Sequence, residues 1–369
     1  MKNLLYIMIL WGIFSQTKPA CPDPVFAAYP LFCAADNTFF MQQFRSGRTQ
    51  VGIFDKNSGW YEPVTPLMYS PTNVMLIPDG SGISFIDNGI IKIKLFSHRS
   101  AQRIEPTLPI FSPSFVQWYS TDFLCCSAQY ANQRGIFFIN KAGGVVPVLY
   151  DHDAYYGHPQ IIDGSLFCIR KHVQTGCNTI VWVPNNVLKS YIDEHGEKYA
   201  ENMSNFTAIQ TIECLSFGTT PVAFLSMSSA TSGYIIGYRQ NETNKGTLIC
   251  FVCYHLQKKE DGWTTQKIFD FSLPTIFITS LAESVAPLLP RYAPSGIYYV
   301  HYDEVADALI PYCYSFLLQQ SQKINLGDNL AKDSGRLTTP MQDGKQLILG
   351  GFDKDFDEAL LVYRDMEIT

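Results

Sequence analysis

The chain has 369 residues, of which 46% are hydrophobic and 14% aromatic, which excludes a disordered composition and allows a large core. Its net charge of −6 and the lack of any dense Lys/Arg run argue against nucleic acid as a partner. Only 16% of the residues are charged, below the roughly 25% of ordinary soluble domains, as expected if most strands face other strands.

The N-terminal segment, MKNLLYIMILWGIFSQTKPAC, has the layout of an export signal. A lysine precedes the apolar residues 4–14, and a polar stretch that contains proline follows. This apolar run is too short to span a bilayer. We therefore expect residues 1–20 to be a signal peptide and the mature protein to be periplasmic or extracellular. Two alternatives stay open, an uncleaved N-terminal membrane anchor, or cleavage after Ala20 with lipidation of Cys21.

Strand-like segments dominate the rest of the chain. Runs such as SGISFID, RGIFFINK, NTIVWVP and SGIYYVHYD are rich in aromatic and β-branched residues and are bounded by turn residues. The exception is residues 186–203, whose charged sequence predicts a short exposed helix or a loop insertion. The fold class is therefore all-β.

The strands also repeat in groups. Residues 48–64, RTQVGIFDKNSGWYEPV, can be laid over residues 132–148, NQRGIFFINKAGGVVPV, and each reads as two strands joined by a turn with Lys and Gly. A second pattern places Asp-Gly before an alternating apolar strand, in PDGSGISFI from Pro78, IDGSLFCIR from Ile162 and QDGKQLILG from Gln342. Asp-Gly favours a tight turn because both residues tolerate positive φ.

This pattern of Pro, Asp-Gly and an apolar strand, followed by a second hairpin, resembles the TolB-type or WD40-like β-propeller repeats of exported bacterial proteins. The clearest copies lie at residues 78–80, 159–164 and 340–344. The resemblance implies a single β-propeller over residues 21–369. TolB itself carries an additional N-terminal α/β domain, for which the first repeat here leaves no room, so only the architecture is carried over.

Repeat spacing favours seven blades, with six as the alternative. The expected blades are 24–66, 67–107, 108–150, 151–213, 214–275, 276–325 and 326–369. Repetition around a ring leaves only short, protected sheet edges, so such a chain can stay soluble as a monomer.

The stretch DHDAYYGH, residues 151–158, falls in a connector between two blades, and connectors of propellers often bind partners. The candidate binding residues are Asp151, His152, Asp153, Tyr155, Tyr156 and His158. His152 and His158 are also candidate metal ligands, but their spacing in a loop fixes no coordination geometry. The pattern favours a surface turn that contacts a partner over a metal or catalytic site, and it predicts no cofactor.

The ten cysteines are expected to act mainly as small buried hydrophobic residues. An exported protein can also form disulfides. Cys168 and Cys177 have the spacing for a bridge across a hairpin and are the candidate pair.

The chain carries no motif of a known enzyme class. A Gly-x-Ser-x-Gly nucleophile elbow, a P-loop and a dinucleotide fingerprint are all missing from the sequence. We therefore expect a protein-binding or scaffolding module that acts through the loops between blades. Two alternatives stay open. One is a hydrolase or lyase with a site in the central channel, metal-assisted or not, and the other is a propeller that binds a glycan or a small molecule.

Overall fold

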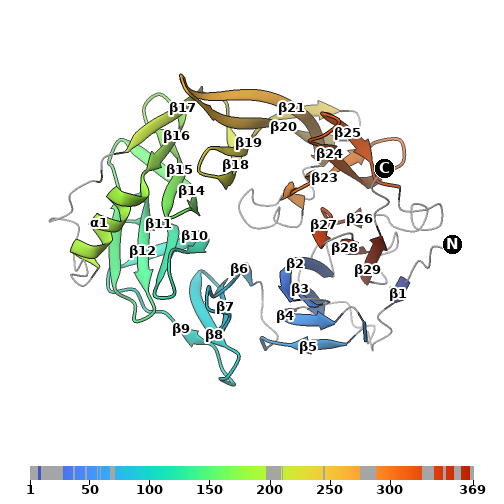
Figure 1. The fold of residues 1–369 in the computed structure, drawn as a ribbon, viewed down its shortest axis with the longest axis horizontal. Coiled ribbons are helices and arrows are strands. Elements are labelled where there is room, and N and C mark those ends of the chain that lie inside the picture. Colours follow the sequence, from blue (N-terminus) through green and yellow to red (C-terminus); the bar gives the residue numbers. More distant parts are fainter. Residues whose placement is uncertain are drawn as a thin grey trace. The chain divides into compact units, whose positions relative to one another are not determined.

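A computed structural model gives the structure of the protein. It describes residues 7–9, 28–35, 38–45, 48–55, 57–58, 60–66, 71–196, 209, 211–243, 246–274, 288–325, 336–343, 346–352 and 359–365. These residues form seven antiparallel sheets and one α-helix (Figure 1). The predicted all-β class is confirmed.

The chain divides into two compact units. Unit 1 comprises residues 1–71, 240–251 and 268–369, and unit 2 comprises residues 72–239 and 252–267. Six of the seven sheets have four strands in simple meander order, as a propeller blade requires.

Unit 2 holds three complete sheets and most of a fourth. The first complete sheet comprises β6 (Thr72–Leu76), β7 (Gly82–Asp87), β8 (Ile90–Leu95) and β9 (Gln102–Arg103). The second comprises β10 (Ile110–Trp118), β11 (Phe123–Tyr130), β12 (Gln133–Asn140) and β13 (Val145–Leu149). The third comprises β14 (Ala154–Ile162), β15 (Ser165–His172), β16 (Asn178–Val183) and β17 (Ile212–Gly218). The next sheet comprises β18 (Val222–Ser229), β19 (Ser232–Thr243), β20 (Gly246–Lys259) and β21 (Gly262–Pro274), whose long strands also contribute residues to unit 1.

Unit 1 holds the first and last sheets along the chain. Two of its sheets have four strands, β2 (Ala28–Ala35), β3 (Thr38–Arg45), β4 (Arg48–Asp55) and β5 (Tyr61–Pro63), and β22 (Arg291–Ala293), β23 (Gly296–Asp303), β24 (Ala308–Ser315) and β25 (Gln320–Lys323). The third sheet contains β1 (Ile7–Ile9), β26 (Arg336–Leu337), β27 (Met341–Asp343), β28 (Gln346–Phe352) and β29 (Ala359–Asp365). Strand β2 packs against β27 and β28, so the first and last sheets are neighbours.

Strand β1 falls within the predicted export signal and pairs with β29. The rest of that signal lies outside the described residues. Among the residues that the structure describes, no helix combines the length and apolar character needed to cross a membrane.

The hairpin turns follow the turn chemistry of the sequence. Asp163 and Gly164 both have positive φ, 51° and 73°, and join β14 to β15 in a two-residue turn, which confirms the Asp-Gly prediction there. At the β6–β7 turn, Gly80 has φ 72° and the Asp79 carboxylate accepts a hydrogen bond from the Ser81 backbone N–H at 2.9 Å. Gly344, in the third Asp-Gly copy, lies outside the described residues.

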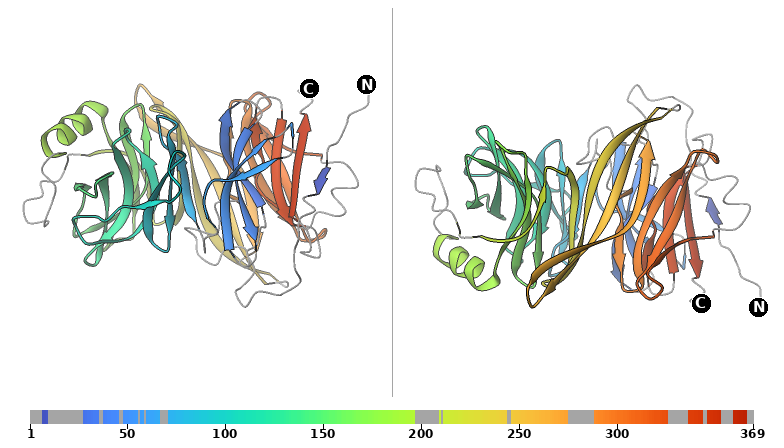
Figure 2. Two further views of the ribbon diagram at one scale, coloured as in Figure 1. Left: turned by 90° about the horizontal axis from the view of Figure 1, so that it is seen from below. Right: turned by 90° about the horizontal axis from the view of Figure 1, so that it is seen from above.

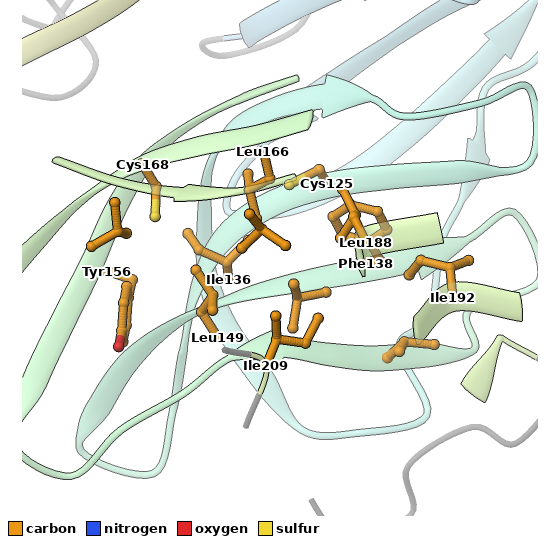
Figure 3. Packing of buried hydrophobic residues seen from close by; sticks show 14 of the residues in the cluster. Cys125, Ile136, Phe138, Leu149, Tyr156, Leu166, Cys168, Leu188, Ile192 and Ile209 are labelled. Atoms are coloured by element: carbon orange, nitrogen blue, oxygen red, sulfur yellow. The ribbon is translucent and has the colours of Figure 1, made fainter. Parts of the chain in front are cut away.

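Helix α1 (Asn185–His195) is inserted between β16 and β17 and lies at the side of the unit 2 sheets (Figure 2). Of the two predicted alternatives, a helix or a loop insertion, the structure shows a helix over these residues, whereas residues 197–208 lie outside the described range. The helix is less exposed than predicted. Leu188 and Ile192, one turn apart on one face, are buried in the core between the β10–β13 and β14–β17 sheets (Figure 3). These two sheets are the third and fourth along the chain, counted from the β2–β5 sheet.

Strand β17 shifts one predicted blade boundary. The boundary after residue 213 falls inside β17, which pairs with β16 and ends the fourth sheet at Gly218. The insertion of α1 between β16 and β17 explains the displacement, because it separates the outermost strand from the rest of its sheet in sequence.

The predicted disulfide between Cys168 and Cys177 is contradicted, because both residues are free thiols. Cys168 lies in β15 opposite Val181, whereas Cys177 is hydrogen-bonded to His172 at the end of that strand. Four residues of extended chain separate the two positions by about 13 Å, well beyond the reach of a disulfide.

Candidate binding face

The stretch 151–158 is only partly a loop. Asp151 to Asp153 form a tight turn in which the Asp151 side chain accepts a hydrogen bond from the Asp153 backbone N–H at 2.9 Å. Strand β14 begins at Ala154 and continues through a β-bulge between Gly157 and Gln160. The expectation that residues 151–158 lie in a connector therefore holds only as far as Asp153, because the bulge interrupts the alternation of side chains without ending the strand.

The six candidate residues do not form one cluster. His152, Asp153 and Tyr155 are exposed, with 38% of Tyr155 accessible. Tyr156 is 6% exposed and belongs to the core of the third and fourth sheets (Figure 3). Burial raises the pKa of its hydroxyl to about 12, so it stays protonated.

Asp151 is engaged in an ion pair with the fourth sheet. Arg170 on β15 contacts the Asp151 carboxylate at 3.2 Å through one terminal nitrogen and Glu213 on β17 at 3.5 Å through the other. The two ion pairs of Arg170 therefore connect the turn to the sheet. Asp151 therefore orders the turn, and its exposed neighbours face the solvent.

Exposed apolar side chains gather at one end of the third and fourth sheets. Phe111 is 58% exposed and lies opposite Gln129, next to the β11–β12 turn, and Gln133 after that turn donates a hydrogen bond to the His152 carbonyl at 3.1 Å. This contact shows that the β11–β12 turn and the start of β14 lie at the same end of the two sheets.

The fourth sheet contributes Tyr155 and Val173 to this end. Tyr155 is opposite Lys171, and the Val173 N–H donates to the Asp153 carbonyl at 2.8 Å, so Tyr155 and Val173 are diagonal neighbours on one face. Val173 is 42% exposed. We call this surface the connector face, and it consists of Phe111, His152, Asp153, Tyr155, Lys171 and Val173.

Three inner strands of unit 2 carry a bulge residue with left-handed backbone. Asn73 in β6, Phe115 in β10 and His158 in β14 have φ of 51°, 52° and 52°, each at an irregularity of the ladder with the next strand. Left-handed φ is uncommon outside glycine, and it is a true outlier for a bulky residue such as phenylalanine. Such strain persists only where the surrounding structure enforces it, and it is concentrated at functional sites.

The His158 ring is held between aromatic side chains of the neighbouring inner strands. Its centroid lies 3.9 Å from that of Phe115 and 6.1 Å from that of Phe224, which meets it edge-on. Nδ1 is buried and has no hydrogen-bond partner in the described part of the chain. Although the ring keeps part of its surface exposed, burial lowers its pKa to about 3, and the charge of Arg134 adds to this effect. His158 is therefore a neutral imidazole.

Arg134 on β12 is positioned by the neighbouring inner strand. One terminal nitrogen donates to Ser114 Oγ at 2.7 Å and to Ser127 Oγ at 3.2 Å, and the other donates to the Ser112 carbonyl at 3.1 Å. Ser127 Oγ in turn donates to the Tyr156 carbonyl on β14 at 2.9 Å. This chain of hydrogen bonds fixes the guanidinium close to the bulge that carries His158.

The metal alternative finds no support in this geometry. His152 lies at the surface beside Tyr150, with ring centroids 5.8 Å apart, whereas His158 packs between phenylalanine rings. Within the described ranges, no three His, Cys, Asp or Glu side chains are grouped as a metal ion requires.

Sequence reasoning missed Phe115, Arg134 and Phe224. The bulge residues Asn73, Phe115 and His158 each lie three or four residues before the end of their strand, but their sequences share no signal for the bulge. Arg134 and Phe224 lie on other strands, and only the packing of the sheets brings them to the bulge.

No protein-family model matches the sequence, and no curated protein matches it. Solved structures do match. A puromycin-hydrolyzing peptidase from Mycobacterium tuberculosis superposes with a TM-score of 0.60 and 11% identity over 94% of this chain, which spans only 53% of the length of that peptidase. The β-propeller domain of the Trilobed protease from Pyrococcus furiosus gives a TM-score of 0.52 and 8% identity over 88% of this chain and 91% of that domain.

The fold is a β-propeller. Identities this low establish the fold and no shared activity. A putative TolB from Agrobacterium tumefaciens also matches, with a TM-score of 0.44 and 11% identity over 67% of this chain and 82% of that one. The propeller fold that the sequence resemblance to TolB-type repeats implied rests on the first two matches, and no family is assigned.

Proposed function

We propose that this β-propeller is a protein-binding module that engages a polypeptide partner through the connector face. The observation that carries this proposal is the exposure of Phe111, Tyr155 and Val173 at one end of two adjoining sheets. Aromatic and aliphatic anchors surrounded by polar groups are typical of interface hot spots.

The energetics favour a partner on this face. A partner that covers these side chains would gain roughly 25 cal/mol of binding free energy for each Å² of apolar area removed from water. His152, Asp153 and Lys171 provide hydrogen-bonding and charged groups around the apolar residues, as the rim of an interface requires. The turn that presents them is braced by the Arg170–Asp151 ion pair, so little ordering entropy is lost on binding.

The proposal also includes the setting of the module. We propose that residues 1–20 direct export, so that the propeller acts as a monomer in the periplasm or outside the cell. The layout of the N-terminal sequence supports this proposal. We further propose that the sheet containing β26–β29 serves as a seventh blade beside the six four-stranded sheets.

The test is crosslinking of the tagged full chain in its native host, followed by mass spectrometry and a direct affinity measurement with the purified partner. The variant F111S/Y155S/V173S is expected to lower the affinity at least tenfold. The matched control is V305S/L317S, which removes residues 96% and 87% exposed outside the connector face. Equal affinity of the connector-face variant and the control would overturn the proposal, as would the recovery of no specific partner.

A further inference from the structure

His158 offers a hydrogen-bond donor next to the connector face. It lies three residues beyond Tyr155 on the same strand, about 10 Å along the chain. Of its two ring nitrogens, Nδ1 is buried and unpaired, whereas Nε2 is neither fully buried nor engaged in a hydrogen bond within the described residues. Nε2 is thus the polar atom that this ring presents to the surface.

The position of the proton follows from the surroundings. A buried N–H without an acceptor is costly and rare, whereas an unpaired lone pair is better tolerated. The proton therefore belongs on Nε2, which points outward as a donor.

The neighbouring groups select the chemistry of the ligand. Arg134 supplies positive potential, which disfavours a cation and favours an anion at Nε2. Phe115 and Phe224 are both partly exposed beside the imidazole and can contact an apolar or aromatic group. A neutral donor, a fixed guanidinium and two phenyl rings together suit a carboxylate attached to an apolar group.

We propose that His158, Arg134, Phe115 and Phe224 form a subsite for a carboxylate of the bound polypeptide. This inference rests on the proposed function and names the partner group that the propeller recognises. The carboxylate can be a C-terminus that follows an apolar residue, or the side chain of an acidic residue. In either case Nε2–H donates to a carboxylate oxygen, and Arg134 stabilises the negative charge.

The test is a ligand-detected NMR titration of the full chain at pH 7 with three probes. N-acetyl-phenylalanine carries a terminal carboxylate, N-acetyl-phenylalaninamide is its neutral analogue, and N-acetyl-glutamic acid α-amide carries only a side-chain carboxylate. We expect at least one acid to bind at least tenfold more tightly than the neutral amide. Tighter binding of the first or the third probe identifies the source of the carboxylate. Equal affinities for acids and amide, or no binding of either acid, would overturn the proposal without the use of any variant.

Substitutions then place the subsite. His158→Phe keeps an aromatic ring between Phe115 and Phe224 but removes the donor, and it should weaken binding of the acid at least tenfold, as should Arg134→Lys. His98→Phe, in an exposed turn of unit 2, is the matched control and should leave affinity within twofold. Full affinity in His158→Phe would overturn the assignment. The probes need no protein partner, so the two proposals can fail separately. If the probes bind but crosslinking recovers no partner, only the proposed function is refuted. If a partner is recovered but the acids do not bind, only the subsite is refuted.

Discussion

At His158, a strained backbone and a buried ring nitrogen coincide. The residue has φ 52° in the bulge of β14, and its ring is held by Phe115 and Phe224. Neither feature follows from the identity of the residue, since a histidine in a loop would be an ordinary titrating group near pH 6.5. The packing of three neighbouring sheets makes this histidine neutral.

We predict that His158 contributes to the pH dependence of stability. Its pKa is about 3 in the folded protein, below the ordinary value near 6.5, so the unfolded chain takes up the proton first. Its contribution is complete above pH 6.5 and is lost as the pH falls toward 3, by at most about 1.4 kcal/mol per pH unit. Urea unfolding at pH 7.5 and 5.0 should show a smaller loss for His158→Phe than for the wild type. An equal loss in both proteins would contradict the prediction.

A second residue-scale prediction concerns the ion pair between the buried Asp87 and the more exposed Lys92. The Lys92 ammonium lies 2.6 Å from Asp87 Oδ2, and the Asp87 side chain is only 8% exposed. Its other oxygen is buried without a partner in the described structure. Lys92→Met should therefore destabilise the protein by about 3 kcal/mol, because it leaves a buried charge uncompensated.

The control for this pair is the double variant Asp87→Asn/Lys92→Met, which removes both charges. Denaturant unfolding should show that it recovers much of the lost stability. If the single and double variants are equally unstable, the charge on Asp87 is not the cause.

At the scale of elements, hairpins were the most predictable feature. Asp163-Gly164 forms the expected turn with both residues at positive φ, and Asn88-Gly89 does the same between β7 and β8. The preference is local, since it depends on the backbone freedom of the two turn residues. The bulges of the inner strands were not predicted, because they depend on pairing with the next strand and on packing against the neighbouring sheet.

Substitutions at two glycines can distinguish backbone strain from a steric clash of an added side chain. Gly89 has φ 72°, and a Cβ there would meet nothing within 4 Å, so Gly89→Ala should cost only about 1 kcal/mol of backbone strain. At Gly143, with φ 95°, a Cβ would collide with the carbonyl oxygen of Glu105. Gly143→Ala should therefore cost at least about 2 kcal/mol more than Gly89→Ala in urea unfolding. Similar losses in the two variants would show that the β12–β13 turn can move away from Glu105.

At the scale of the whole molecule, the cysteines are packing residues. Eight cysteines between residues 125 and 313 are free thiols, and four of them, Cys125, Cys126, Cys168 and Cys253, are buried. Burial raises the pKa of each of these four thiols and keeps them from reacting as thiolates. The core is therefore compatible with the oxidising compartment that the proposed export implies.

We accordingly predict that thermal unfolding is insensitive to reductant. The midpoint of unfolding should shift by less than about 1 °C between oxidising buffer and buffer with a phosphine reductant, since the eight cysteines between residues 125 and 313 form no disulfide. A loss of several degrees in reductant would contradict the free-thiol assignment.

The sequence by itself determined the all-β class, the propeller fold, the Asp163-Gly164 turn and the presence of an insertion after residue 185. These features depend on alternation, turn residues and repetition, which are local properties of the chain. Only the tertiary structure showed that Tyr156 is core while Tyr155 is exposed, and that Cys168 cannot reach Cys177. It also brought Arg134, Phe115 and Phe224 to His158, because packing between sheets joins residues that no sequence spacing connects.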